Sequence, residues 1–69
     1  MLQTFEITIY NQQVRALVFD GESHKRYRDE WADTHYIEFD AESEADAIAK
    51  CDRKYPKADG FVIEAVLEA

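Results

Sequence analysis

Alternation of apolar and polar residues predicts two strands in the first part of the chain. From Gln3 to Tyr10, Phe and Ile recur at every second position, which is the period of a half-buried strand. The run Val14 to Phe19 is rich in β-branched and aromatic residues and is apolar on both sides, so it predicts a second strand covered on both faces. The polar residues Asn11 to Gln13 form a break whose length suits a hairpin.

The second half predicts a strand, a helix and another strand between Thr34 and Val66. Apolar residues alternate with polar ones from His35 to Ala41, as in a half-buried strand. A helix from Ser43 to Tyr55 begins at a good N-cap residue and has acidic residues in its first turn, where negative charge suits the helix dipole. Its apolar face consists of Ala47, Ile48, Cys51 and Tyr55. Alternation resumes at Phe61, which predicts the last strand.

The segment from Glu22 to Asp33 has two interpretations. Ser23 is a suitable N-cap for a short helix that carries Tyr27 and Trp31 on one face. The same residues also fit a long polar loop that is pinned by the two aromatic side chains. The short helix is the preferred interpretation.

Together these elements predict one α+β domain over residues 1–69. The expected sheet is mixed, has three or four strands, and combines the N-terminal hairpin with a β-α-β unit. The main helix is expected on one face of the sheet, with a second short helix as an option. A right-handed crossover makes the Thr34 and Gly60 strands parallel, with another strand between them. Pro and Gly number only three and 46% of residues are hydrophobic, which favours a packed fold over disorder.

The sheet face opposite the main helix is expected to be apolar. Tyr36, Val62 and Val66 fall on that side by alternation, and the apolar residues of the run from Val14 to Val18 are expected to join them. Such a face requires cover from the segment that contains Tyr27 and Trp31, from a second copy, or from a partner.

Acidic residues concentrate in one part of the chain. The net charge is −7, yet the window from Asp29 to Asp46 holds eight acids and no Lys or Arg, and the remaining residues hold seven acids and eight bases. A local field of this sign repels nucleic acid and favours a basic protein partner. The expected partner-binding residues are these eight acids and two aromatic residues: Asp29, Glu30, Asp33, Glu38, Asp40, Glu42, Glu44, Asp46, Tyr36 and Trp31.

The sequence contains no motif typical of a metal, cofactor or catalytic site. His24, His35 and Cys51 lack the tight pairing that metal sites show, so no metal and no cofactor are expected. The chain contains no nucleophile elbow and no phosphate-binding Gly loop, and carboxylate pairs such as Glu38 with Glu64 are expected on a solvated sheet face, so the protein is not expected to be an enzyme. The basic run from Lys25 to Arg28 is interpreted as a solvated face or as a partner for the acidic window, rather than as a nucleic-acid contact.

One segment is similar to a pattern common in small bacterial and phage orphan proteins. It is the sequence Glu-Phe-Asp-Ala-Glu-Ser-Glu-Ala-Asp-Ala-Ile, followed by a helix to Tyr55 and Pro56. The size, the expected hairpin and the localised acidity also resemble small phage-encoded inhibitors such as anti-CRISPR proteins. Several of those are similar to nucleic-acid mimics that occupy basic grooves. The resemblance therefore implies an inhibitor that mimics nucleic acid, and it transfers no individual residue.

These observations rank a non-catalytic protein-binding module first, with the acidic window facing a basic partner. The alternative is a structural or accessory subunit that dimerises, or joins an enzyme complex, through an apolar sheet face. A small enzyme or ligand-binding domain ranks third. No membrane contact is expected because no apolar run approaches the roughly 20 residues of a membrane span. The N-terminal alternation lacks the layout of a signal peptide and Cys51 stands alone, so a cytoplasmic location is expected.

Overall fold

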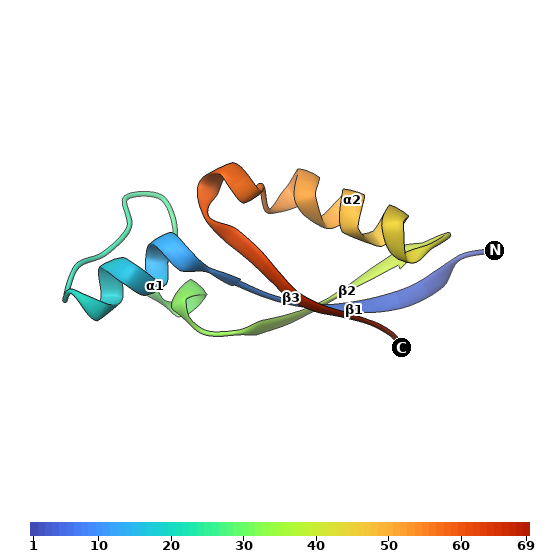
Figure 1. Ribbon diagram of the computed structural model, residues 1–69, viewed down its shortest axis with the longest axis horizontal. Helices are drawn as coiled ribbons and strands as arrows, with labels where there is room; N and C mark the ends of the chain where they lie inside the picture. The colour runs from blue at the N-terminus through green and yellow to red at the C-terminus, as the bar shows by residue number, and fades with distance from the viewer.

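The computed structural model describes residues 1–69 and contains three strands, two α-helices and two short 3₁₀ helices (Figure 1). In chain order these are β1 (Gln3–Asn11), α1 (Gln12–Phe19), η1 (Asp29–Ala32), β2 (His35–Ala41), α2 (Glu44–Lys54), η2 (Lys57–Asp59) and β3 (Phe61–Glu68). The molecule is elongated, with principal extents of 45 × 19 × 14 Å. The α+β class and the strand–helix–strand unit between residues 34 and 66 are therefore confirmed.

The sheet has the order β2-β1-β3, and β1 pairs with both neighbours in antiparallel fashion. β2 and β3 consequently point the same way with β1 between them, as the crossover argument predicted. The two edge strands do not pair with each other, so every ladder in the sheet is antiparallel and the predicted mixed sheet is wrong.

The predicted second strand is a helix. Residues 14–19 belong to α1, which follows β1 directly, so there is neither an N-terminal hairpin nor a fourth strand. The reason lies in Asn11, whose side-chain oxygen accepts a hydrogen bond from the backbone N–H of Val14 at 3.0 Å and caps the helix. Only Val14 of α1 is buried, while Phe19 stays 90% exposed. The local cap at Asn11 thus outweighs the strand preference of β-branched residues.

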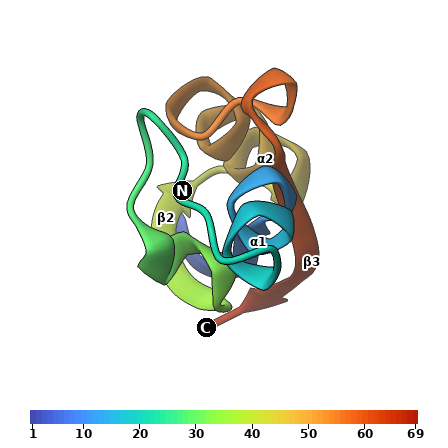
Figure 2. The same ribbon diagram turned by 90° about the vertical axis from the view of Figure 1, so that its left-hand side faces the viewer.

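The core lies between α2 and one side of the sheet. Phe5, Ile7 and Ile9 of β1 are buried and belong to the same cluster as Ala47 and Cys51 of α2. Figure 1 shows α2 above the strands, and Figure 2 shows the same layering from the end at which α1 lies. α2 begins at the predicted cap, where Ser43 Oγ accepts from the backbone N–H of Asp46 at 3.1 Å. None of the helices is long and apolar enough to cross a membrane.

The segment before β2 is an irregular loop followed by the short helix η1. It contains no α-helix, so the loop interpretation is closer to the structure than the preferred one. The Tyr27 and Trp31 rings lie 5.0 and 5.2 Å from the ring of Phe61, and Trp31 also lies 5.2 Å from Tyr55. These aromatic side chains therefore extend the core at the end of α2, and they do not cover the opposite side of the sheet.

A β-bulge changes which residues of β3 share a face. The register with β1 shifts between Thr8 and Ile9, where one extra residue of β3 is accommodated. Because paired residues lie on the same side of a sheet, Val66 lies on the core side opposite Ile7, and it packs against the core. Simple alternation had placed Val66 on the opposite side, and that prediction is wrong.

Candidate functional site

The side of the sheet away from α2 is an open surface formed by all three strands. We call it the open face. The register gives its members as Thr4, Glu6, Thr8 and Tyr10 of β1, Tyr36, Glu38 and Asp40 of β2, and Val62, Glu64, Ala65 and Leu67 of β3. Figure 1 shows no helix on this side of the strands. The apolar residues of α1 do not contribute to it, so the open face is more acidic and less apolar than alternation predicted.

Two carboxylates face each other at the centre of the open face. Glu6 of β1 is the direct register partner of Glu38 of β2. Directly opposed residues in antiparallel strands have Cβ atoms about 5 Å apart, and a like-charge pair at this position costs up to about 1 kcal/mol. Neither side chain forms an ion pair within the protein. The fold therefore retains an unfavourable contact that a cation from outside would relieve.

Two further carboxylates are held over the same surface by threonines. The hydroxyl of Thr4 donates to Asp40 Oδ1 at 2.7 Å, and the hydroxyl of Thr34 donates to Glu64 Oε1 at 3.0 Å. The second bond runs from the start of β2 to β3 and so draws the Glu64 side chain back across β1. The open face thus carries four carboxylates, of which Asp40 and Glu64 are held in place by hydrogen bonds.

Large exposed side chains accompany these acids. Tyr36 is 68% exposed and Leu67 is 59% exposed. The guanidinium of Arg15 stacks 3.6 Å above the ring of Tyr10 and donates to the backbone oxygen of Ala32 at 2.7 Å. This arginine lies at one end of the open face, and its charge is already engaged.

The acidic window predicted from the sequence is not one surface. Tyr36, Glu38 and Asp40 lie together on the open face. The remaining acids divide between two distant segments: Asp29, Glu30 and Asp33 in or beside η1, and Glu42, Glu44 and Asp46 at the start of α2. Trp31 packs on the core beside Tyr55 and Phe61.

Sequence analysis placed Glu38 and Glu64 on a solvated sheet face, but it included neither Glu6 nor Glu64 among the expected partner-binding residues. The alternation from Gln3 to Tyr10 already placed Glu6 on the polar side of its strand, so the signal was present. Alternation from Phe61 had likewise placed Glu64 on the side of Val62, and the bulge in β3, which has no clear signature in this sequence, changes the side only of the residues that follow it.

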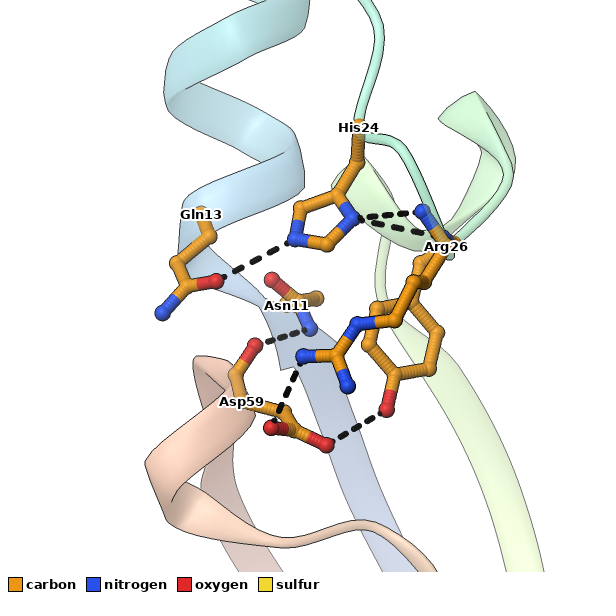
Figure 3. Close-up of polar contacts among 6 residues, drawn as sticks. Asn11, Gln13, His24, Arg26 and Asp59 are labelled. Carbon is orange, nitrogen blue, oxygen red and sulfur yellow. Dashed lines mark hydrogen bonds and ion pairs between the residues drawn. The ribbon is translucent and has the colours of Figure 1, made fainter.

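A separate polar cluster joins the loop before η1 to the end of η2 (Figure 3). Asp59 Oδ2 accepts from the hydroxyl of Tyr27 at 2.7 Å, and Oδ1 accepts from Arg26 Nη2 at 3.1 Å. The hydrogen bond from Tyr27 is the main cause that lowers the pKa of Asp59, and the same bond raises the pKa of Tyr27. The buried amide of Asn11 donates to the backbone oxygen of Asp59 at 3.0 Å. Both carboxylate oxygens of Asp59 are engaged, so the cluster holds the loop before η1 against η2 and has a structural role.

His24 and Cys51 carry side chains that could take part in chemistry, but both are engaged in structural contacts. His24 Nδ1 accepts from the backbone N–H groups of Arg26 and Tyr27 at 3.0 and 3.3 Å, which leaves Nε2 to donate to Gln13 Oε1 at 3.2 Å. Cys51 is fully buried in the core, and this burial raises the pKa of its thiol. No group of three or more His, Cys, Asp or Glu residues is arranged to hold a metal ion.

Comparison with known proteins found no matching family model, no matching curated protein and no matching solved structure.

Proposed function

We propose that this protein is a non-catalytic binding module whose open face engages a basic protein surface. The observation that carries this proposal is the opposed pair of Glu6 and Glu38, which lies between the tethered carboxylates Asp40 and Glu64 and has no compensating cation. A cationic partner would place positive charge beside the two glutamates. Binding would therefore relieve the repulsion that destabilises the free protein.

The apolar residues of the open face suit such a partner. Tyr36 and Leu67 flank the opposed pair, because Leu67 is the register partner of Glu6, and Tyr36 lies two residues from Glu38 on the same strand. Tyrosine is enriched at protein interfaces, where exposed aromatic residues supply contact area and charged groups supply specificity. Pairing of two open faces with each other is disfavoured because it brings carboxylates against carboxylates.

A short unstructured arginine peptide is a suitable probe for this activity, with binding measured by calorimetry at low and high salt. The double variant E6Q/E38Q should weaken binding several-fold at low salt. The matched control E22Q/E42Q removes the same charge from two exposed side chains that lie outside the open face, and it should bind nearly as well as the unmodified protein. Equal losses in the two variants, or affinity that ignores salt, would contradict the proposal.

The opposed pair also predicts an effect on stability. Because E6Q/E38Q removes a like-charge contact, its free energy of unfolding should be unchanged or higher by up to about 1 kcal/mol. A variant that binds less and unfolds no more easily separates a binding role for the two carboxylates from a structural one.

A narrower form of the proposal is that the partner's basic surface is one that binds nucleic acid. Glu38 and Asp40 stand two residues apart on β2, so their Cα atoms are roughly 6.7 Å apart in a row of negative charges. The protein should then displace the arginine peptide from a DNA duplex, as measured by fluorescence anisotropy. E6Q/E38Q should displace it less well than E22Q/E42Q, and equal displacement would count against mimicry by this face.

A further inference from the structure

β3 is an edge strand with an apolar cavity beside it. It has β1 on one side only, so the backbone N–H and C=O groups on its outer side are free to pair with another strand. A cavity of about 430 Å³ lies along the first residues of β3, between the strand and α2. Its lining is Gln12, Ile48, Lys57, Phe61, Val62 and Ile63. Edge and cavity together form a place where an added strand would gain both hydrogen bonds and apolar contacts.

The bulge gives β3 a face pattern that reads the same in both directions. From Phe61 to Glu68, the residues at positions 61, 63, 66 and 68 lie on the core side, and those at 62, 64, 65 and 67 lie on the open face. When two such strands pair antiparallel with residue 61 opposite residue 68, every residue meets one from the same face. Outside the bulge, hydrogen-bonding direction alternates with the same period as side-chain direction, so the backbone groups of residues 61–63 match those of residues 66–68 in the second strand, and only residues 64 and 65 at the bulge lack a regular ladder. Shifting this register by one residue loses the match along most of the strand.

We propose that β3 pairs antiparallel with the β3 strand of a second copy of this chain, with Phe61 opposite Glu68, in a symmetric dimer. Two three-stranded sheets then join into one continuous six-stranded sheet. Both α2 helices lie on the same side of it, and the two open faces merge on the other side. This inference goes beyond the proposed function because it concerns the edge of the sheet and not the acidic face.

The proposed register places apolar side chains in contact on both sides of the sheet. Ile63 faces Val66 of the second copy on the core side, where Val66 enters the cavity beside Ile48. On the open face, Val62 faces Leu67 of the second copy, which covers the exposed side chain of that leucine.

Charge complementarity supports the same register. Glu68 lies opposite Phe61 of the second copy, and Lys57 lines the cavity beside Phe61. Neither Lys57 nor Glu68 forms an ion pair within the monomer, and the dimer brings them together twice. The hydrogen bond from Thr34 draws Glu64 back over its own sheet, away from its counterpart near the symmetry axis.

The other edge of the sheet is less suited to self-pairing. Regular alternation along β2 puts Glu38 opposite Glu38 in an antiparallel pair of two β2 strands centred on that residue, which is a repulsive arrangement. The side chain of Lys50 also crosses to this strand and donates to the backbone oxygen of Asp40 at 2.7 Å. β3 is therefore the edge that favours a second copy.

Sedimentation equilibrium and a charge swap test this dimer. The unmodified chain should rise from a mass of 8.1 kDa towards twice that value as its concentration reaches the millimolar range. K57E alone and E68K alone should each weaken the dimer at least several-fold, because each opposes like charges at both contacts. An equimolar mixture of the two variants should recover dimerisation, since K57E paired with E68K restores opposite charges at both contacts.

An intermolecular nuclear Overhauser effect between labelled and unlabelled chains would identify the register. The methyl groups of Val62 and Leu67 are far apart within one strand, so a contact between them can arise only across the proposed interface. A chain that stays monomeric at millimolar concentration would overturn the inference, as would a dimer that ignores the charge swap or lacks this contact. Binding of the arginine peptide by E6Q/E38Q and its control tests the proposed function separately.

Discussion

Replacement of Gly60 by alanine is expected to destabilise the fold through its left-handed backbone conformation and through contacts of the added Cβ atom. Gly60 follows η2 with a backbone φ of +101°, and its carbonyl accepts from the backbone N–H of Gln12 at 2.8 Å. A Cβ atom at this position would lie 2.6 Å from Gln13 Cγ and 2.8 Å from Asn11 Oδ1. The Gln13 side chain is exposed and able to move, whereas Asn11 is fully buried and hydrogen-bonded at both ends.

The magnitude follows from two contributions. A left-handed φ costs a residue with a Cβ roughly 1–2 kcal/mol. Displacement of the Asn11 side chain would also weaken the N-cap of α1, which is worth about 1 kcal/mol. The expected loss for Gly60→Ala is therefore about 2–3 kcal/mol, a large share of the roughly 3–10 kcal/mol expected for a domain of this size.

Gly21→Ala is the matched control. Gly21 also has a positive φ, of +75°, but a Cβ atom there would meet nothing within 4 Å. It should lose only the backbone contribution, so the difference between the two variants in urea unfolding, followed by circular dichroism, isolates the contacts of the added Cβ atom with Asn11 and Gln13. Equal urea midpoints for the two variants would refute the reasoning.

Further expectations concern the polar cluster. Asn11→Ala should lower the free energy of unfolding by about 2 kcal/mol, because it removes a cap and a buried hydrogen bond; urea unfolding measures this. The lowered pKa of Asp59 contributes stability that is complete above its ordinary value of 3.8 and is lost as pH falls further. Tyr27→Phe should raise the pKa of Asp59 in an NMR titration and make acid unfolding less steep; an unchanged pKa would show that the Tyr27 bond is not its main cause. Nitrogen NMR shifts should show His24 with its proton on Nε2, and a proton on Nδ1 would contradict the hydrogen bonds of its ring.

Much of the fold was predictable because several local signals agree over residues 34–68. The apolar period of two, the Ser43 cap and the renewed alternation at Phe61 all point to the same elements, and they are present. The error at Val14 to Phe19 has a different origin. Those residues prefer strands, and their helix depends on the Asn11 cap and on the bond from Gln12 to Gly60, which is distant in sequence.

The candidate site was predictable only in part, because a window of sequence is not a patch of surface. β2 and the start of α2 follow each other along a molecule 45 Å long, so consecutive acids spread along it. Meanwhile Glu6, from a different part of the chain, meets Glu38 through strand pairing. Strand register and the bulge in β3 decide which acids gather, and neither can be read from charge counts.

Amide chemical-shift mapping with the arginine peptide tests the central claim most directly. If the open face is the binding surface, the largest changes at low salt should fall on Glu6, Thr8, Tyr36 and Glu38, and they should diminish in E6Q/E38Q. Changes concentrated at the start of α2, around Glu42 to Asp46, would contradict the account. They would favour binding by the acidic window from Asp29 to Asp46 instead.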